Sequence, residues 1–335
     1  MEPLRIGVLG AARISESAIV IPAQLTGARL VAVAARDSTR AEEFAQQHGV
    51  ERVVDSYQAL VEDPQIEAIY NPLANGLHGP WNLRAIAAGK HVLTEKPFAS
   101  NVAEAISVRD AADAAGVRVM EAFHYRYHPV MLRMLEITAG GELGPIVRVE
   151  ANMEIPAPPI GDPRWSLELA GGAMMDLGCY SLHTCRTLGA LLGGDPVLLA
   201  ARGRENPGAP GVDEWMETDL EFPSGATGAA NCSMAADAVS FSLRVIGTDG
   251  EARAHCLLAP WVDDGITVTI GGTERVERLG RRTSYTYQLE VFTQWVREGG
   301  SIPTDADDAV ANMRMIDAVY EMSGLGLRRT FGSDS

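Results

Sequence analysis

Strand-like and helical patterns alternate through the first 120 residues of the chain. Helical stretches such as STRAEEFAQQHG and GPWNLRAIAAG separate short apolar runs that are rich in branched side chains. Alternation at this spacing forms βαβ units, which build a parallel sheet covered on both faces. The pattern predicts a doubly wound α/β domain over residues 1–124, with strands in LRIGVLG (4–10), ARLVAVAA (28–35), AIYNPL (68–73), KHVLTEKP (90–97) and VRVMEAF (117–123).

The character of the sequence changes after Pro129. A strand-like stretch (143–155), a Pro-rich loop and a helix are followed, from about 195 to 280, by short strands between Gly, Pro or Asp turns. This pattern is typical of a large, mostly antiparallel sheet. Two helices, around 285–299 and 305–325, close the chain. We expect a second, α+β domain over residues 125–335 for substrate binding and oligomerisation, because 335 residues exceed the size of a single core.

Composition excludes several classes of function. Hydrophobic residues make up 46% and charged residues 21%, as in ordinary globular proteins. The net charge of −16 argues against nucleic acid or an anionic membrane as a partner. No run resembles a signal peptide or a membrane helix. The four cysteines lack the short spacing of a zinc or redox site, which predicts reduced thiols in a cytoplasmic protein.

The first strand runs into a loop, GVLGAARIS, that has the context of a dinucleotide-binding fingerprint. Gly10, Ala12 and Ser15 occupy the three glycine positions of G-x-G-x-x-G, and only the first is glycine. Ala and Ser are still small enough for a backbone to approach a pyrophosphate. We therefore expect a Rossmann domain with cofactor contacts at Gly10, Ala12, Arg13 and Ile14.

The second strand ends in AARDSTR, residues 34–40, where the ribose of the cofactor would lie. A carboxylate at this tip accepts from the ribose 2′-OH of NAD, whereas a 2′-phosphate requires arginine. Arg36 comes first and Arg40 lies one turn later, which favours NADP over NAD. The alternative is that Asp37 and Arg40 only open and cap the next helix.

A third feature is the segment GGAMMDLGCYSLH, residues 171–183. Wound as an α-helix, it places Asp176, Tyr180 and His183 on one face, and nearly every other position is apolar or small. Such a helix is buried where it packs and polar where it lines a cleft. Its two leading glycines suggest close approach by a ligand. Trp165 is a candidate wall of the substrate pocket, with ordinary packing as the alternative.

Two histidines, His124 and His128, have a metal-compatible spacing of four. A metal site needs further ligands, and no third ligand is evident in the sequence. We therefore expect no metal and interpret both residues as flanking the junction between the domains.

With TEKP at residues 94–97, the ordered set of motifs resembles one family. The glycine loop, NPLANGLH (71–78), EKP and GGAMMDLGCY are similar to the glucose–fructose oxidoreductase, inositol dehydrogenase and MocA-like family over most of the chain. The resemblance implies a cis peptide bond before the proline of EKP and a substrate contact at Arg126. It also implies cofactor contacts at Asn71, Pro72, His78, Glu95, Lys96 and Pro97.

Within that family, AVAARD (32–37), MEAFHYRYHP (120–129) and the GGA-x-x-D-x-G-x-Y helix look most like the dihydrodiol, xylose and ketosugar dehydrogenase or reductase branch. That branch is largely NADP-linked. The pattern of inositol dehydrogenases has His where this chain has Tyr180, so Tyr180 argues against the inositol branch.

The resemblance implies hydride transfer at a carbon that bears oxygen, which needs a nicotinamide and a group that handles the proton. An ordinary phenol, with a pKa near ~10, is a poor base at neutral pH, but a nearby cation such as Lys96 favours its phenolate. We therefore expect Lys96 and Tyr180 to be catalytic, with Asp176 holding Lys96 or a substrate hydroxyl. His183 would contact another hydroxyl or Tyr180.

Two other functions remain open on the sequence. One is a glycosidase, because relatives of this fold use tightly held NAD to cleave glycosides through transient oxidation. The other is a non-catalytic sensor that binds NADP and a protein partner. The chain is also expected to form a homo-oligomer, most simply a dimer, on the sheet of the second domain. The motive is partly the resemblance and partly that the strands from 213 to 270 carry apolar residues on both alternating faces, for example Leu220, Phe222, Phe241, Leu243 and Val245.

Overall fold

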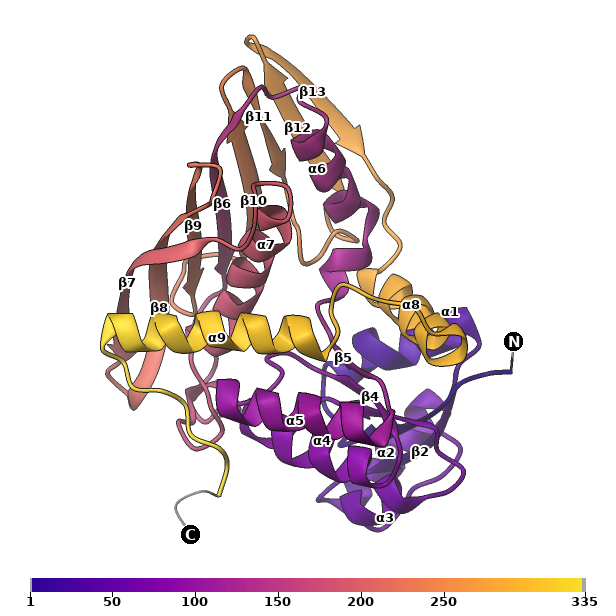
Figure 1. Ribbon diagram of the computed structural model, residues 1–335. Helices are drawn as coiled ribbons and strands as arrows, with labels where there is room; N and C mark the ends of the chain where they lie inside the picture. Colours follow the sequence, from indigo (N-terminus) through magenta and orange to yellow (C-terminus); the bar gives the residue numbers. More distant parts are fainter. Residues whose placement is uncertain (1, 333–335) are drawn as a thin grey trace. The chain divides into compact units, whose positions relative to one another are not determined.

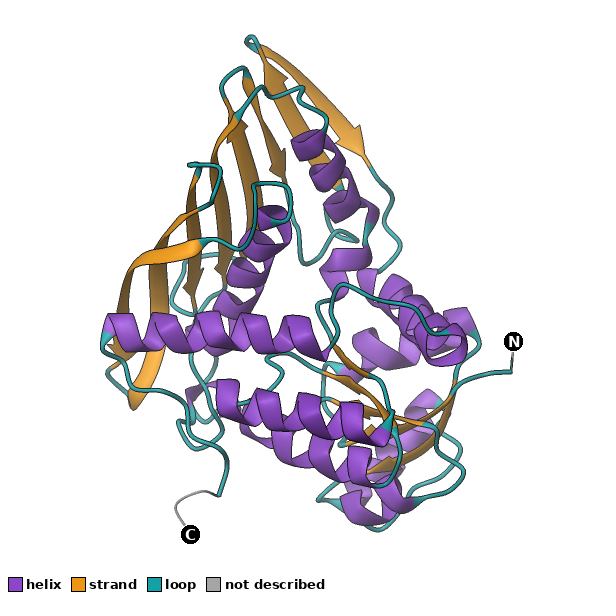
Figure 2. Cartoon of the chain, in the orientation of Figure 1, coloured by secondary structure: helices purple, strands orange, loops and turns teal. Residues whose placement is uncertain are grey.

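A computed structural model gives the structure of the protein and describes residues 2–332 (Figure 1). The chain folds into two compact units. Unit 1 contains the chain up to Phe123 together with residues 285–311 and 329 onward, and unit 2 contains residues 124–284 and 312–328. Helices and strands alternate through unit 1, whereas unit 2 is dominated by strands (Figure 2).

Unit 1 contains the expected parallel sheet. Its strand order is β2-β1-β3-β4-β5, and every neighbouring pair is parallel. The strands are β1 (Arg5–Leu9), β2 (Arg29–Ala34), β3 (Ala68–Asn71), β4 (His91–Thr94) and β5 (Val119–Glu121). After β2 the chain returns to the other side of β1, so the order reverses between β1 and β3. Open α/β sheets bind ligands at the carboxyl ends of strands at such a switch point.

Helices in unit 1 follow the expected stretches of sequence. Side chains cap the amino ends of some of them: Ser56 accepts from the N–H of Ala59 at 3.0 Å, and Asn101 accepts from that of Glu104 at 3.0 Å. Gly49 and Gly116 end two helices in the left-handed conformation. The helices are α1 (Ile21–Thr26), α2 (Ser38–His48), α3 (Tyr57–Glu62), α4 (His78–Ala87), α5 (Val102–Ala115) and α8 (Ser284–Glu298).

Unit 2 contains a sheet in the order β13-β12-β11-β10-β6-β9-β8-β7. Only the β6–β9 pair is parallel, so the expectation of a large, mostly antiparallel sheet is confirmed. The strands are β6 (Ile146–Glu154), β7 (Val197–Asn206), β8 (Ala209–Glu221), β9 (Thr227–Ser233), β10 (Ser240–Gly247), β11 (Gly250–Ala254), β12 (Gly265–Ile270) and β13 (Thr273–Arg278). Two helices, α6 (Pro129–Ala139) and α7 (Cys179–Gly189), pack on this sheet, α7 against β6 and β9 and α6 against β11 and β12.

The apolar residues of this sheet lie on one face, which corrects the expectation of two apolar faces. Leu243 pairs with Ala151 and Val245 with Val149, and all four are buried on the face that α7 covers. By the same register, Leu220, Phe222 and Phe241 also point to the covered side. Alternation along one strand identifies a buried face but does not show how many faces are buried.

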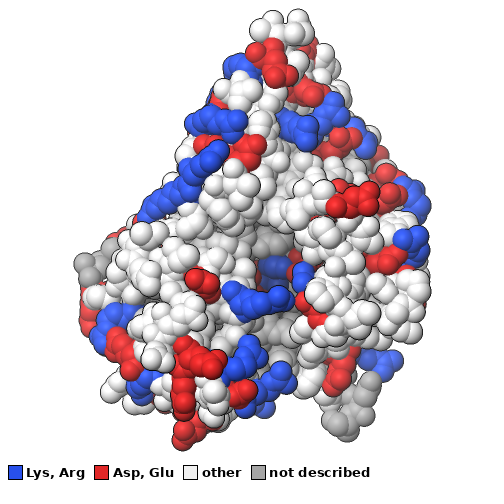
Figure 3. All heavy atoms as spheres, turned by 180° about the vertical axis from the view of Figure 1, so that it is seen from behind, with Lys and Arg blue, Asp and Glu red and all other residues white. Residues whose placement is uncertain are grey.

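The opposite face of the sheet carries charged side chains that pair with each other. Arg148 binds Glu150 at 2.7 Å, Arg244 contacts Glu150 at 3.4 Å, and Arg244 also pairs with Glu251. In the residues that the structure describes, Lys and Arg are interspersed with Asp and Glu over the surface drawn in Figure 3. The expectation of a dimer therefore loses the part of its support that came from two apolar faces of this sheet.

The last part of the chain is shared between the units, although we expected a second domain running from 125 to 335. Residues 285–311, which include most of α8 and the start of α9 (Ala306–Ser323), cluster with unit 1. Arg297 of α8 binds Glu67 at 2.8 and 3.0 Å, and the N–H of Glu121 donates to the carbonyl of Thr304 at 3.0 Å. These long-range contacts cannot be read from local patterns.

None of the four cysteines forms a disulfide bond, as expected for reduced thiols. Within residues 2–332, no helix is both long and apolar enough to cross a membrane.

The Glu67–Arg297 pair predicts a pH-dependent stability. Arg297, followed by the backbone N–H of Arg5, lowers the pKa of Glu67 below its ordinary value. A carboxyl whose pKa is lower in the folded protein than in the unfolded chain stabilises the fold at pH values above its unfolded-state pKa. This stabilisation is lost as the pH falls through its folded-state pKa. Glu67→Gln should therefore lower the free energy of unfolding at pH 7 by about 1 kcal/mol, with a smaller cost below pH ~4. Urea unfolding at pH 7 and below pH ~4 measures this, with Glu43→Gln, an exposed residue of α2, as the control. An equal loss of unfolding free energy in Glu67→Gln at the two pH values would contradict the prediction.

Candidate functional site

The loop after β1 has the shape that a dinucleotide site needs. Gly10 adopts a positive φ of +87°, and its N–H donates to the carbonyl of Ala34 at 2.7 Å. A Cβ on Gly10 would lie 3.2 Å from the side chain of Leu73, which follows β3. The loop then turns through Ala12 into the helix, where the buried hydroxyl of Ser15 has no hydrogen-bond partner within the described chain. These features fit a bound pyrophosphate: a glycine turn without room for a side chain and, at the start of a helix, a hydroxyl without a partner in the described chain.

Two expectations concern the tip of β2: that its arginines bind a 2′-phosphate, and that Asp37 and Arg40 only open and cap the next helix. Asp37 Oδ1 accepts from the N–H groups of Thr39 at 3.0 Å and Arg40 at 3.3 Å, so Asp37 is the N-cap of α2. The guanidinium of Arg40 donates to the carbonyl of Ala11 at 2.9 Å, which places this cation beside the glycine loop. Arg36 is exposed at the same strand end. The carboxylate of Asp37 is thus occupied with the amino end of α2, while the two cations Arg36 and Arg40 lie at the tip of β2.

The segments after β3 and β4 are held together by buried polar side chains. Asn71 donates to Asn82 Oδ1 at 2.8 Å, and Pro72 behind it is buried. His78 Nδ1 lies 2.7 Å from the carbonyl of Pro97, and Nε2 lies 2.8 Å from that of Leu73. Burial lowers the pKa of His78 to about 4, so at pH 7 the ring is neutral and donates from one nitrogen only. The ring is a brace between two loops, and both its nitrogens face protein carbonyls.

The EKP turn presents Lys96 at the carboxyl end of β4. Glu95 is buried and accepts from the hydroxyl of Tyr70 at 2.8 Å. The Lys96–Pro97 peptide bond is cis, as the resemblance implied. Lys96 is half-buried, and its charge contributes to lowering the pKa of His78. Gly10 and Lys96 therefore follow β1 and β4, and Asn71 ends β3, so all three lie at the carboxyl end of the sheet.

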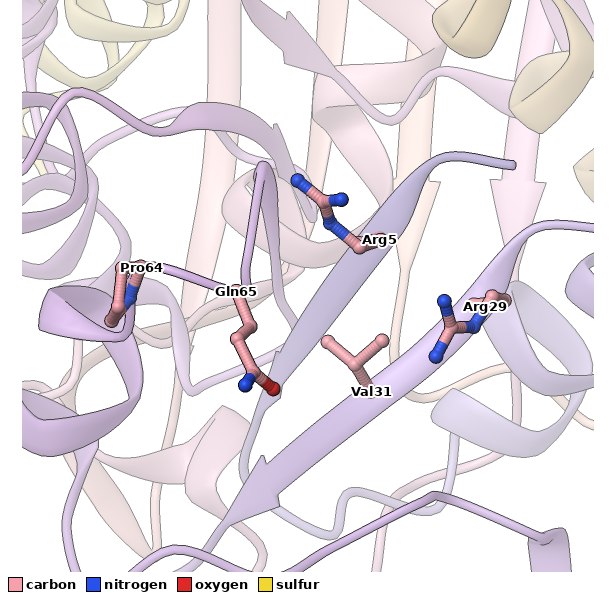
Figure 4. Close-up of a pocket in the computed structure, with 5 residues that line it drawn as sticks. All are labelled: Arg5, Arg29, Val31, Pro64 and Gln65. Carbon is pink, nitrogen blue, oxygen red and sulfur yellow. The ribbon is translucent and has the colours of Figure 1, made fainter. Parts of the chain in front are cut away.

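A hollow of about 350 Å³ lies at the other edge of the same sheet, where β1 and β2 begin (Figure 4). Its arginines already have carboxylate partners: Arg29 binds Glu51 at 2.8 Å and Arg5 lies 3.5 Å from Glu67. The remaining lining residues are Val31, Pro64 and Gln65. This hollow is far from the strand ends that bind ligands in such sheets, so it is not the cofactor site.

In unit 2 the segment with the polar stripe begins as a π-helical turn, Met174–Gly178, and continues as α7. The N–H of Cys179 donates to the carbonyl of Met174, five residues back. The α-helical spacing that we expected therefore does not hold through Asp176. Single π turns inside helices often occur at functional sites. Asp176 is paired with Arg164 at 3.6 Å.

Tyr180 lies in a cluster of aromatic and imidazole rings. Its ring meets those of His124 and Tyr125 edge to face, with centroid distances of 5.8 and 6.0 Å, and its side chain is only 4% exposed. The hydroxyl of Tyr125 lies 2.6 Å from His183 Nδ1 and accepts from Thr184 at 3.0 Å.

The structure gives the other substrate candidates definite places. Trp165 is half-buried on the 3₁₀ turn Pro163–Trp165, and its indole N–H donates to the carbonyl of Pro158 at 3.1 Å. Arg126 is half-buried on the turn His124–Tyr127. Sequence reasoning missed Tyr125, although it lies in the motif MEAFHYRYHP, because its contacts with α7 span 58 residues.

The two histidines considered for metal binding have protein partners. His124 Nδ1 lies 2.7 Å from the hydroxyl of Ser284. His128 accepts from the N–H of Val130 at 3.1 Å and thereby caps α6. No group of three or more potential metal ligands occurs among residues 2–332.

The two glycines that open the site helix have a structural reason, which corrects the inference of close ligand approach. A Cβ on Gly171 would overlap the carbonyl oxygen of Arg164, and a Cβ on Gly172 would overlap the carboxylate of Asp213. Gly172 also adopts a φ of +133°. Protein atoms, rather than a ligand, occupy the space that these glycines leave.

Comparison with known proteins agrees with this architecture. Residues 4–123 match a family model described as an oxidoreductase family with an NAD-binding Rossmann fold, and residues 131–253 match the GFO/IDH/MocA C-terminal domain. The chain is 35% identical over 326 residues to D-xylose 1-dehydrogenase (NADP(+)) 2 of Haloferax volcanii, covering 96% of this chain and 98% of the relative. It is 34% identical over 262 residues to trans-1,2-dihydrobenzene-1,2-diol dehydrogenase of Mus musculus, covering 77% and 76%.

Among solved structures, a 3-ketoreductase from Actinomadura kijaniata in complex with NADP and TDP-benzene superposes with a TM-score of 0.88 at 27% identity. The superposition covers 96% of this chain and 98% of that one. The chain belongs to the glucose–fructose oxidoreductase, inositol dehydrogenase and MocA-like family. The expectation of a nicotinamide-dependent dehydrogenase or reductase is thereby confirmed.

The contacts of Gly172 predict a large difference between two glycines of positive φ. Gly172→Ala should destabilise the protein by about 3 kcal/mol, because strained backbone and overlap with Asp213 add together. Gly225→Ala in an open turn, with φ of +86° and no atom within 4 Å, should cost only about 1 kcal/mol. Thermal unfolding of both variants measures this, and equal shifts in Tm would show that Asp213 leaves room for a side chain.

Proposed function

We propose that this chain is an NADP-dependent oxidoreductase acting on a sugar, ketosugar or vicinal diol. When bound, NADP supplies the nicotinamide that exchanges a hydride with the carbinol or carbonyl carbon. The observation that carries the proposal is the carboxyl end of the unit 1 sheet, where Gly10 follows β1, the Arg40–Ala11 contact follows β2 and Lys96 follows β4. The names of the relatives, an NADP-linked xylose dehydrogenase and a dihydrodiol dehydrogenase, support the same class of substrate.

The cofactor would be held by the residues at the ends of these strands. In the proposal, Gly10, Ala12, Arg13 and Ile14 border the pyrophosphate, and Arg36 and Arg40 bind the 2′-phosphate. Asp37 supports this choice because its Oδ1 already accepts two backbone hydrogen bonds from α2. The nicotinamide end would be bordered by Asn71, Pro72, Glu95, Lys96 and Pro97, with His78 bracing the two loops from behind.

Tyr180 and Lys96 would handle the proton at the substrate oxygen. Tyr180 is almost fully buried among rings, an environment that disfavours a phenolate. A cation is therefore required if the phenolate, which is the form of Tyr180 that accepts a proton, is to be populated near neutral pH, and Lys96 is proposed to supply this cation. In the oxidative direction Tyr180 Oη takes the proton from the substrate hydroxyl, and in the reductive direction it returns the proton.

The remaining residues would orient the substrate. Asp176, held by Arg164, is proposed to accept a hydrogen bond from a substrate hydroxyl. His183 contacts the Tyr125 hydroxyl through Nδ1, and its Nε2 is proposed to form a hydrogen bond with another substrate hydroxyl. Trp165 and Arg126 are proposed as pocket walls. The proposal also retains a cytoplasmic homodimer, which rests on the resemblance alone because the apolar motive failed.

The arginines at the tip of β2 predict cofactor preference. NADPH should bind at least tenfold more tightly than NADH, about 1.4 kcal/mol, and Arg36→Ala should reduce this preference. Nicotinamide fluorescence titration measures both constants, with Arg253→Ala on exposed β11 as the control that leaves them unchanged. Equal affinities in the wild type would refute the assignment, and a preference for NADH would make Asp37 the ribose ligand.

The proton role predicts a selective loss of turnover. Tyr180→Phe removes one oxygen from a packed helix, so folding and NADPH binding should stay nearly unchanged. Its kcat should fall by about 10²–10⁴, measured with the best substrate of a panel of aldoses and diols that begins with D-xylose. Tyr125→Phe, which makes the same chemical change in a neighbouring ring, should cost much less. Full activity in Tyr180→Phe, with inactivity in His183→Ala, would transfer the acid–base role to His183.

A further inference from the structure

Unit 2 contains a buried ion pair that the proposed chemistry does not use. Asp213 of β8 is 0% exposed, and its partner Arg328 is 1% exposed. Tyr320 of α9 donates its hydroxyl to Asp213 Oδ1 at 2.9 Å, and the guanidinium of Arg328 lies 4.2 Å from the centroid of the Tyr320 ring. Both charges are therefore paired and surrounded by protein.

This pair holds the start of the helix that carries Asp176 and Tyr180. Asp213 Oδ2 accepts from the N–H of Met174, the first residue of the π turn, at 2.7 Å. Arg328 Nε donates to the carbonyl of Gly171 at 2.7 Å. The first four N–H groups of a helix lack partners within the helix, so an external carboxylate fixes both the position and the direction of that start.

A second contact fixes the far end of the π turn. Asn312 of α9 is fully buried and donates to the carbonyl of Cys179 at 3.2 Å, where the π turn meets α7. Asp176 lies between the two anchors, and its N–H donates to the carbonyl of Gly172 at 2.9 Å. A shift of Gly172 or Met174 would therefore move Asp176, and Tyr180 one turn further along.

Stability alone does not account for such a pair. Burying two charges costs solvation, and apolar residues of similar volume often stabilise a fold equally well. An ion pair with fixed hydrogen bonds differs from an apolar contact in its directionality. Sites of this kind lose activity when supporting groups allow the reacting side chain to shift by even one ångström.

We propose that Asp213, with Arg328 and Tyr320, is a positioning residue for the acid–base segment Asp176–Tyr180. This inference rests on the proposed function, because it assigns the cluster to turnover rather than to folding. The cluster touches neither cofactor nor substrate in this account. It acts by fixing the direction in which the π turn starts after Gly172, and thereby the positions of Asp176 and Tyr180.

Two variants test the proposal. Tyr320→Phe removes one hydrogen bond to Asp213 and leaves the ring on Arg328, and Asp213→Asn keeps an acceptor for Met174 while removing the charge. Each should lower kcat by about 10- to 100-fold and leave the Kd for NADPH unchanged. The matched control is Thr218→Val on the same strand, which removes a buried hydrogen bond to Ala230 that does not reach the helix start. Its kcat should stay within twofold of the wild type.

A double variant separates positioning from general loosening. If the cluster acts through Tyr180, adding Tyr320→Phe to Tyr180→Phe should cost less than twofold more. Wild-type kcat in Tyr320→Phe would overturn the proposal. So would a loss of kcat that Tyr320→Phe causes to the same extent in the Tyr180→Phe background, or an equal loss of kcat in Thr218→Val. If Asp213→Asn does not fold, Tyr320→Phe alone decides. Wild-type turnover in Tyr180→Phe is a different result, which refutes the proton role itself.

Discussion

The carboxylate of Asp213 is the contact on which the arrangement of unit 2 most depends. It joins β8 to the first residue of the π turn and, through Arg328 and Tyr320, to the end of the chain. Because its oxygens occupy the space beside Gly172, the segment can enter the helix only with glycine at that position. The helix then presents Tyr180 to the rings of His124 and Tyr125.

Unit 1 depends on a different constraint, the switch point of its parallel sheet. Because the chain crosses to the other side of β1 after β2, the loops after β1 and β3 meet at the switch point, where a Cβ on Gly10 would lie 3.2 Å from the side chain of Leu73. Buried polar groups then fix the neighbouring turns, with His78 between Leu73 and Pro97 and Tyr70 on Glu95. The family model that matches unit 1 is described as an NAD-binding Rossmann fold, and such folds bind dinucleotides at this switch point.

Much of this architecture could be predicted from sequence because it is written in local patterns. Alternating apolar runs identified the strands of the parallel sheet, and the closing helices fell close to α8 (Ser284–Glu298) and α9 (Ala306–Ser323). The parts that could not be predicted depend on distant contacts. The wide turn at Met174–Gly178, the reason for Gly172 and the place of Tyr125 beside His183 are each set by residues tens of positions away. Likewise, alternation in the strands of unit 2 did not show that one face carries paired charges.

The central claim is that this chain exchanges hydride between NADP and a polyhydroxylated substrate. The most direct measurement is the near-ultraviolet absorbance of the purified protein incubated with NADP⁺ or NADPH and a panel of aldoses, ketosugars and vicinal diols. The account predicts stoichiometric formation of NADPH with at least one aldose or diol, or its consumption with a ketosugar. No change in free cofactor with any of them, together with glycoside cleavage by enzyme that retains its own NAD, would contradict it.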